Sequence, residues 1–417
     1  MNRTTMFCAV LSCLVLANAE VPQVSNVSFT QLSRSREVQV TYSLDMPAVV
    51  TLDVQTNNAA DLSGAWVSIG DIHLRTANGD VNRIVTNSIS VIHWHPNRDW
   101  PEGGSLANVR TVVTAWATNS PPDYLVIDIE NPKSVRFYTS PDAFPEGNVT
   151  NDIYKTQMLV MRRVPAAGVP WQMGSPTTEW GHQAQETRHT VTLNSDYYIG
   201  IYPVTRYQHA RFQSKAPDAT MQTYSVDEMP YDTLRGSTSD NVNWPNTDIY
   251  TVGSNSILKK IRNLLGFTFD IPTDAQLEYA CRAGTGTALN IGVTPANDSE
   301  MASCRPRIAH AYGSSLNEVA SPVGSNEPNN WGIYDMHGGD SFTWCRDWYV
   351  ADLGSADAED PAGPAETTGV RVLRGANWHQ SNAYLRSAYR ISRAPADKWT
   401  GYGHDIGYRL WLPVTLY

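Results

Sequence analysis

Cysteine is scarce in this chain, which contains five cysteines among 417 residues. Cys8 and Cys13 fall in an apolar stretch near the N-terminus, and the others are Cys281, Cys304 and Cys345. We expect the N-terminal stretch to be cleaved off, which leaves three cysteines. Three cysteines allow at most one internal disulfide, for which Cys281 and Cys304 are a candidate pair. A small scaffold held together mainly by disulfides is therefore excluded.

Charge is also sparse, and it is mostly negative. Charged residues make up 17% of the chain and the formal net charge is -10. Lys and Arg form no run; the nearest approach is Arg386, Arg390 and Arg393, which are interleaved with apolar residues. Because phosphate binding needs clustered cations, we expect no nucleic-acid partner.

Long apolar runs are missing after the N-terminal stretch, so we expect no transmembrane segment, which would need ~20 apolar residues. Residues 1–19 match a secretory signal peptide, with Arg3 before an apolar stretch and the small-residue site Ala17-Asn-Ala19. We expect cleavage after Ala19 and a secreted or periplasmic protein. A lipoprotein attachment at Cys13 is the alternative.

The chain does have enough apolar residues for real cores: 41% are hydrophobic, with 13 Trp and 20 Tyr. Its length favours two or three domains. Residues 20–140 contain several short stretches that alternate apolar and polar residues, such as Val38 to Ser43, separated by Asn, Gly, Asp and Pro turns. This pattern predicts an all-β sandwich of immunoglobulin or fibronectin type.

Breaker-rich residues 141–153 are predicted to be a linker, and residues 154–417 a second domain of α+β type. Capping boxes predict helices that begin after Thr205 and after Thr273. Apolar residues at helical spacing predict a third helix from Ile257 to Leu265, ending at Gly266.

Four phrases in the last quarter of the chain identify a resemblance. They are Pro328-Asn-Asn-Trp-Gly-Ile-Tyr-Asp-Met-His-Gly338, Trp344-Cys-Arg-Asp-Trp348, Arg371-Val-Leu-Arg-Gly-Ala-Asn-Trp378 and Ile406-Gly-Tyr-Arg409. With further phrases in matching order, among them Ile271 to Gly284, they resemble the formylglycine-generating enzymes, also called sulfatase-modifying factors. The resemblance covers residues 154–417 and implies a C-type-lectin-like fold. No such resemblance covers the N-terminal part.

The family's catalysts oxidise a substrate cysteine with two cysteines that recruit copper and follow the Arg-Gly-Gly-Ser-aromatic phrase. Matching Gly375 to Trp378 with that phrase puts Gln380 and Leu385 at the two positions. Neither can bind Cu(I) as a thiolate would, so copper is not expected. Cys345 lies in a phrase expected to be packed, and we interpret it as a structural residue.

Calcium is the cofactor that the resemblance implies, as a structural ion. Asp340 stands near the family's usual Asn ligand, while Thr343 replaces a Glu. Asn297 and Asp298 are candidates for a second site. The alternative is that these are ordinary turn residues in polar loops.

Aromatic and amide side chains near the expected groove favour recognition of a protein or glycan ligand. The candidate ligand-binding residues are Trp378, His379, Gln380, Tyr384, Trp399 and His404. The alternative is that Trp378 and Trp399 fill the core. Arg374, Arg386, Arg390 and Arg409 are expected to hold the fold through carboxylate and carbonyl contacts.

Ten histidines leave an enzymatic alternative open, a divergent metal-dependent oxidase or oxygenase built from His337, His379, His404 and Asp405. His93 and His95 are a second candidate pair, on one face of a strand, although hydrogen-bonded histidine is the simpler interpretation. The residues favour an exported binding or structural module over a catalyst.

Overall fold

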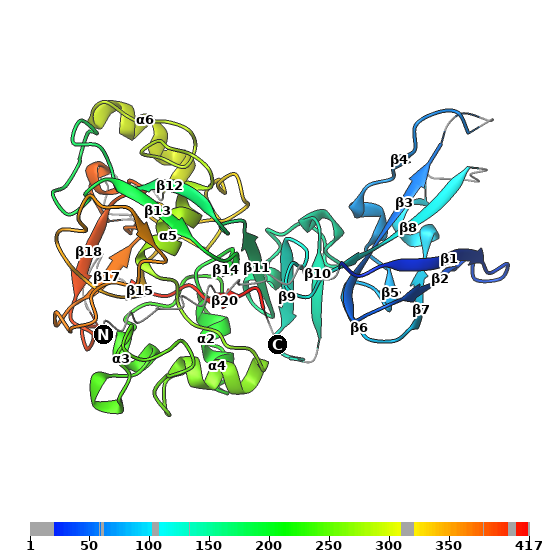
Figure 1. Ribbon diagram of the computed structural model, residues 1–417, viewed down its shortest axis with the longest axis horizontal. Coiled ribbons are helices and arrows are strands. Elements are labelled where there is room, and N and C mark those ends of the chain that lie inside the picture. Colours follow the sequence, from blue (N-terminus) through cyan, green and yellow to red (C-terminus); the bar gives the residue numbers. More distant parts are fainter. Residues whose placement is uncertain are drawn as a thin grey trace, which may run out of the picture.

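The computed structural model describes residues 21–57, 59, 62–101, 108–132, 134–309, 321–377, 379–398 and 406–415. The signal peptide expected at residues 1–19 lies outside the described residues. Figure 1 shows an elongated molecule, with the N-terminal strands at one end and most of the C-terminal elements at the other.

The N-terminal region consists of two antiparallel sheets with short connections. The first has the order β1-β2-β7-β5; in the second, β3 pairs with β4, β6 and β8. The strands are β1 (Val24–Gln31), β2 (Val38–Leu44), β3 (Ala48–Thr56), β4 (Val67–Ser68), β5 (Asn78–Gly79), β6 (Arg83–Val85), β7 (Ile89–Trp94) and β8 (Val109–Trp116). Two short helices, η1 (Asp71–Leu74) and α1 (Pro96–Asp99), lie between strands.

These two sheets share one apolar core. In β2 every second residue is buried, as the alternation of Val38, Val40, Tyr42 and Leu44 predicted. These side chains pack with Val50 and other residues of β3 and with residues of β7. The prediction of a β-rich N-terminal region is therefore confirmed.

A third sheet lies between the two ends of the molecule (Figure 1). Its order is β10-β9-β11-β14-β20, and all its pairs are antiparallel. The strands are β9 (Tyr124–Asp128), β10 (Val135–Tyr138), β11 (Met158–Val164), β14 (Tyr197–Gly200) and β20 (Trp411–Pro413). We expected residues 124–138 to belong to the N-terminal sandwich, but their hydrogen bonds join them to strands of the C-terminal region. This sheet crosses the boundary expected at residue 140.

The expected linker, residues 141–153, is packed rather than extended. It contains η3 (Pro141–Ala143) and the start of η4 (Asp152–Lys155). Phe144 is fully buried, and its ring lies 5.1 Å from those of Tyr138 and Tyr154. Aromatic packing of this kind anchors the segment against the third sheet.

The rest of the C-terminal region combines two further sheets with short helices. The sheets have the orders β12-β13-β16 and β18-β17-β15-β19. Their strands are β12 (Val169–Met173), β13 (His189–Leu193), β15 (Phe342–Trp348), β16 (Ala358–Glu359), β17 (Arg371–Arg374), β18 (Arg390–Arg393) and β19 (Ile406–Gly407). The helices are α2 (Arg206–Phe212), α3 (Tyr231–Leu234), η5 (Thr238–Asp240), α4 (Ile257–Leu265), α5 (Asp274–Arg282), α6 (Asp298–Ile308) and η6 (Asn382–Tyr384).

Local capping signals located three of these helices correctly. Thr205 and Thr273 each form a capping box with the Gln three residues later. Helix α4 ends at Gly266, whose left-handed conformation (φ 79°) suits glycine. No helix formed by the described residues combines the length and apolar character needed to cross a membrane.

Candidate functional site

The two positions that correspond to the family's cysteine pair lie in different environments. Leu385 is fully buried in the largest hydrophobic cluster. Gln380 is half-buried; its backbone N–H donates to the Asn377 carbonyl (3.1 Å), and its carbonyl accepts from Arg305 Nη1 (3.1 Å). An aliphatic side chain packed in a core cannot bind a metal or form a disulfide with a substrate cysteine. Leu385 therefore cannot perform the chemistry of the cysteine that it replaces.

The segment around Gln380 packs on helix α6. Asn382 Oδ1 accepts from Arg305 Nη1 (2.9 Å), and Asn382 Nδ2 donates to Asp298 Oδ1 (3.0 Å). Tyr384 stacks on Tyr389, with ring centroids 4.7 Å apart. The structure thus brings Gln380 and Tyr384, two predicted ligand-binding residues, into the neighbourhood of Asp298, a predicted calcium ligand.

His379 of the same segment is half-buried. The other three predicted ligand-binding residues, Trp378, Trp399 and His404, lie outside the described residues, as does Asp405.

Asn297 and Asp298 begin helix α6, where we had weighed calcium against a polar turn. Asn297 Oδ1 accepts from the Glu300 N–H (3.0 Å), which caps the helix. The helix was not predicted because its residues are mostly polar and include Pro306. The side chains of both candidates are therefore already engaged, one in the cap and one with Asn382.

Asp340 is buried just before β15. Its Oδ2 accepts from Ser225 Oγ (3.2 Å), and that hydroxyl also lies 3.0 Å from Ser341 Oγ. A carboxylate beside two hydroxyls offers the hard oxygen atoms that calcium prefers. Among the described residues, no three His, Cys, Asp or Glu side chains gather as a metal site.

None of the three described cysteines is in a disulfide, so the candidate Cys281–Cys304 pair is not bridged. Cys345 is fully buried in β15, as its structural interpretation predicted, and burial raises the pKa of its thiol well above the ordinary value. Burial also raises the pKa of Cys281 to about 11. Both thiols are therefore protonated at neutral pH and poor nucleophiles.

His337 is an interior residue rather than a groove residue. It is 1% exposed, and its Nε2 accepts from the Asn290 N–H (3.2 Å) and lies 3.6 Å from Cys281 Sγ. Burial lowers the pKa of His337 to about 3, so its imidazole is neutral. His95 does not lie on the strand as expected, because β7 ends at Trp94 and His95 precedes helix α1. His93 contacts Glu37, as the hydrogen-bonded interpretation predicted.

Buried arginines pair with carboxylates and carbonyls throughout the region, as predicted. Arg374 contacts Asp274 and lies 2.8 Å from Glu278 Oε2, while Arg390 Nη2 lies 2.7 Å from Asp274 Oδ2. Arg386 contacts two carboxylates, Glu179 and Glu186, and Arg409 donates to the carbonyls of Gly200 and Tyr334 (2.7 Å each). Burial alone would raise the pKa of Asp274, but the two arginines beside it hold that pKa below the ordinary value.

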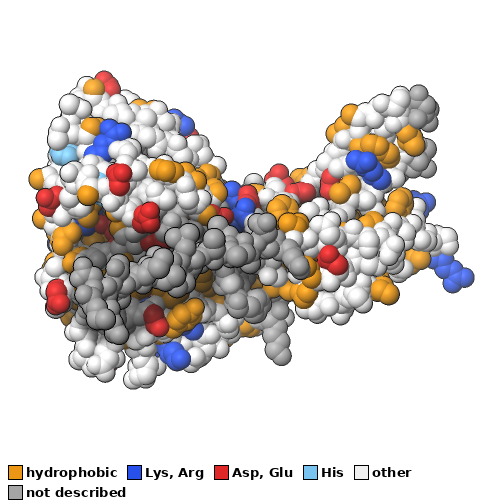
Figure 2. Space-filling view, in the orientation of Figure 1, with side chains coloured by type: hydrophobic (Ala, Val, Ile, Leu, Met, Phe, Trp, Pro, Cys, Tyr) orange, Lys and Arg blue, Asp and Glu red, His pale blue; other side chains and the backbone are white. Residues whose placement is uncertain are grey.

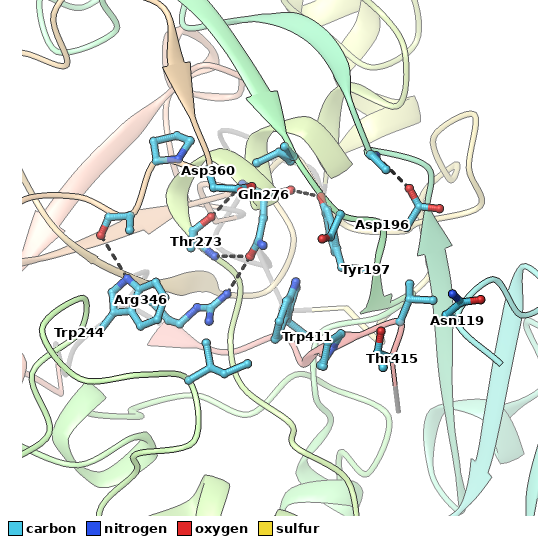
Figure 3. Close-up of a pocket in the computed structure, with 18 residues that line it drawn as sticks. Asn119, Asp196, Tyr197, Trp244, Thr273, Gln276, Arg346, Asp360, Trp411 and Thr415 are labelled. Carbon is cyan, nitrogen blue, oxygen red and sulfur yellow. Dashed lines mark hydrogen bonds between the residues drawn. The ribbon is translucent and has the colours of Figure 1, made fainter. Parts of the chain in front are cut away.

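Figure 3 shows a cavity of about 580 Å³ whose lining includes no residue of the 379–384 segment. It is lined by Asn119, Ala167, Leu193, Ser195, Asp196, Tyr197, Trp244, Ile249, Thr273, Gln276, Arg346, Asp360, Pro361, Ala362, Trp411, Pro413, Val414 and Thr415. The described residues among those that we predicted as ligand-binding, His379, Gln380 and Tyr384, do not line this cavity.

Arg346 organises the inner wall of the cavity. Its guanidinium carbon lies 4.6 Å from the ring centroid of Trp244 and 4.5 Å from that of Trp411. Figure 3 shows the guanidinium directed toward Gln276, whose Oε1 accepts from Arg346 Nη2 (2.9 Å). The same Oε1 accepts from the Thr273 N–H (3.0 Å), which ties the wall to the start of α5.

Sequence reasoning missed this cavity because its walls come from distant segments. Trp244 and Arg346 are 102 positions apart by their numbers, and Trp411 comes from β20. The one local signal was the capping box at Thr273, which placed Gln276 on the first turn of a helix but not beside an arginine.

Comparison with models of known protein families identifies the family of this chain. A model described as "Sulfatase-modifying factor enzyme 1-like domain" matches residues 155–411, which is more than half of the chain. The chain therefore belongs to this family, and the resemblance inferred from its motifs is confirmed.

Two solved structures are similar to part of this chain. PvdO from Pseudomonas aeruginosa is 23% identical with a TM-score of 0.48, and the match covers 61% of this chain and 94% of that one. Treponema denticola variable protein 1 is 21% identical with a TM-score of 0.46, and the match covers 61% and 95%.

Curated relatives match over shorter stretches. Serine/threonine-protein kinase pkn1 of Chlamydia pneumoniae is 33% identical over 136 residues, which are 32% of this chain and 20% of the relative. Pkn1 of Chlamydia trachomatis serovar L2 is 38% identical over 85 residues, which are 20% of this chain and 14% of the relative. The chain spans a fifth or less of the length of these relatives, and the kinase activity in their names is theirs.

Proposed function

We propose that this chain is an exported binding or structural module of the sulfatase-modifying-factor family that does not oxidise cysteine. One observation carries the proposal: Leu385, at one of the two positions of the family's cysteine pair, is fully buried in the core. The protonated, buried thiols of Cys281 and Cys345 support it, because neither can replace the missing thiolate without moving out of the core.

We further propose the finer architecture that the resemblance implies. The two N-terminal sheets form a sandwich of immunoglobulin or fibronectin type, and the C-terminal region has a C-type-lectin-like fold. Residues 1–19 direct export and are removed. The 379–384 segment, packed on α6, presents Gln380 and Tyr384 to a protein or glycan ligand, because half-buried aromatic and amide side chains are common in recognition surfaces.

A peptide assay tests the central proposal. The purified mature protein is incubated with a sulfatase peptide that bears the target cysteine, together with Cu(I) and oxygen, and the product is analysed by mass spectrometry. We expect unmodified peptide. Formylglycine formation that disappears in the Gln380→Ala variant, with Gln172→Ala on exposed β12 as the matched control, would overturn the proposal.

Metal analysis separates the enzymatic alternative from the binding module. We propose Asp340 as the remaining calcium ligand, with the hydroxyls of Ser225 and Ser341 beside it. Calcium is expected to raise the melting temperature of the wild type and to have a smaller effect on Asp340→Asn. Stoichiometric copper or iron in the protein would instead favour an oxidase or oxygenase.

A further inference from the structure

The cavity beside Arg346 has an aromatic floor and a polar rim. Trp411 and Tyr197 lie on paired strands, with ring centroids 6.4 Å apart, and the ring of Trp244 lies 4.6 Å from the Arg346 guanidinium carbon. The exposed residues Asn119, Ser195, Asp360 and Thr415 form part of the rim. Flat apolar surface next to amides, hydroxyls and carboxylates is suited to a ligand that has an apolar face and many hydroxyl groups.

The hydrogen-bonding groups of the cavity are fixed by the fold. Asp360 Oδ1 accepts from the Asn194 N–H (3.0 Å), and Asp196 Oδ1 accepts from the N–H groups of Ala166 and Ala167 (2.9 Å each). Each carboxylate keeps a second oxygen that can accept from a ligand hydroxyl. Gln276 uses its Oε1 internally and makes no hydrogen bond through Nε2 among the described residues, which leaves this amide as a donor.

Two buried side chains in the wall carry donor atoms without acceptors among the described residues. Arg346 is 2% exposed and Trp411 6% exposed. The Nε and Nη1 of Arg346 and the Nε1 of Trp411 find no hydrogen-bond acceptor among the described residues; Asp270 Oδ2 lies 3.8 Å from Nη1, beyond hydrogen-bond distance. Buried donors usually have partners, so these atoms are the places in the wall where an ordered water would be accommodated.

The charges of the cavity favour an uncharged ligand. Asp196 Oδ2 lies 3.9 Å from Arg163 Nε, and Arg346 is near Asp270. Asp360 is then the lining charge without an ion pair among the described residues. Its carboxylate at the rim repels anions, and the Arg346 guanidinium in the wall disfavours cations.

The floor is not suited to an added peptide strand. Trp411 already exchanges both backbone hydrogen bonds with Asp270 (2.7 and 2.9 Å), and its neighbour β14 covers the other edge of β20. Pro413 has no N–H to donate. Pairing of an extended peptide with β20, the usual mode at a sheet edge, is therefore blocked.

From these observations we infer that the cavity binds an uncharged saccharide of one or two rings. An apolar ring face packs against the half-buried indole of Trp244, and ring hydroxyls donate to Asp360 and Asp196 and accept from Gln276 Nε2. This inference extends the binding role proposed above to a named cavity and ligand class, at a place separate from the 379–384 segment.

The test uses the purified mature protein on an array of uncharged and charged glycans, followed by titration of the best uncharged saccharide by intrinsic tryptophan fluorescence. We expect a Kd below about 1 mM. Gln276→Glu keeps the capping box and the Arg346 contact but removes the amide donor, and we expect binding about tenfold weaker. Asp360→Asn is expected to weaken binding by about fivefold.

Asp352→Asn is the matched control, because Asp352 is an exposed aspartate that also accepts a backbone N–H, from Gly354, and does not line this cavity. Its affinity should equal that of the wild type. The inference fails if no uncharged saccharide binds, if charged glycans or cationic ligands bind better, or if Gln276→Glu and Asp360→Asn bind like the control. Oxidation of the sulfatase peptide would overturn the proposed function while leaving saccharide binding standing, so the two failures are distinguishable.

Discussion

The two ends of the molecule are stabilised by different means. In the N-terminal sheets the buried polar residues among those described are Thr51, Asn57 and Ser90, none of them charged. In the C-terminal region five of the largest fully buried side chains are arginines: Arg235, Arg346, Arg371, Arg390 and Arg409. Figure 2 shows that charged side chains on the visible surface are scattered rather than gathered into one patch. The charged side chains that distinguish the two regions are therefore the buried arginines of the C-terminal region.

The difference follows from the amount of regular structure. Long paired strands satisfy their own backbone groups, so the N-terminal sheets need only apolar side chains between them. The C-terminal region has many loops, whose carbonyls need donors when they are buried. Arginine supplies several donors from one side chain, as Arg409 does for Gly200 and Tyr334.

The largest effect is expected from removing a carboxylate that two buried arginines share. Asp274→Ala leaves Arg374 and Arg390 without this partner, and the free energy of unfolding of the C-terminal region should fall by about 3–5 kcal/mol. Chemical denaturation measures the change. Asp352→Ala, on the surface, should stay within about 0.5 kcal/mol of the wild type. A loss below about 1 kcal/mol for Asp274→Ala would show that the buried pairs are not what holds this region.

Creating a cavity in the N-terminal core should lower the free energy of unfolding somewhat less. Leu52→Ala removes a buried side chain of β3 and should lower the free energy of unfolding of that region by about 2–4 kcal/mol. Since no charged side chain is buried among the described residues of this core, the loss should be the same at acidic and neutral pH. A strongly pH-dependent loss would contradict the contrast drawn between the two regions.

The pH dependence of stability should therefore come mainly from the C-terminal region. Burial and the nearby Asp274 charge raise the pKa of Asp347 from 3.8 to about 7. Between these two pKa values the folded state binds a proton that the unfolded state has released. The contribution of Asp347 to the free energy of unfolding is therefore full below pH 3.8 and is lost as pH rises toward about 7. Asp347→Asn keeps an acceptor for the Asp274 N–H (2.8 Å in the wild type) and should flatten the profile in that window. An unchanged profile in thermal unfolding would refute this assignment.

The smallest expected effect concerns a helix cap. Ser256 Oγ accepts from the Lys259 N–H (3.1 Å) at the start of α4. Ser256→Ala should lower stability by about 1 kcal/mol and Ser256→Gly by only a few tenths, because glycine is tolerated at this position. Equal losses for the two variants in denaturant titrations would indicate that packing, not capping, is affected.

The features predicted from the sequence are those that depend on neighbouring residues. The capping boxes at Thr205 and Thr273 and the stop at Gly266 were found because each is a signal within a few positions. The family was found from phrases that stand in order along the chain. Helix α6 was missed because polar residues and Pro306 obscure its pattern.

What could not be predicted depends on partners far away in the chain. The apolar run in β9 marks a strand but does not say that its partner is β11 rather than a strand of the N-terminal sheets. In the same way, nothing near Arg346 in the sequence indicates that two tryptophans enclose it.

The sheet order of the third sheet has a consequence for biosynthesis. Its outer strand β20 pairs with β14, and the adjacent Arg409 donates to Gly200, 209 positions earlier. A ribosome-bound chain that does not yet include residues 409–413 leaves β14 with an open edge and the Gly200 carbonyl without its arginine. Such an intermediate exposes a strand edge of the kind that aggregates, so productive folding of this region is a late event that benefits from a chaperone on the nascent chain.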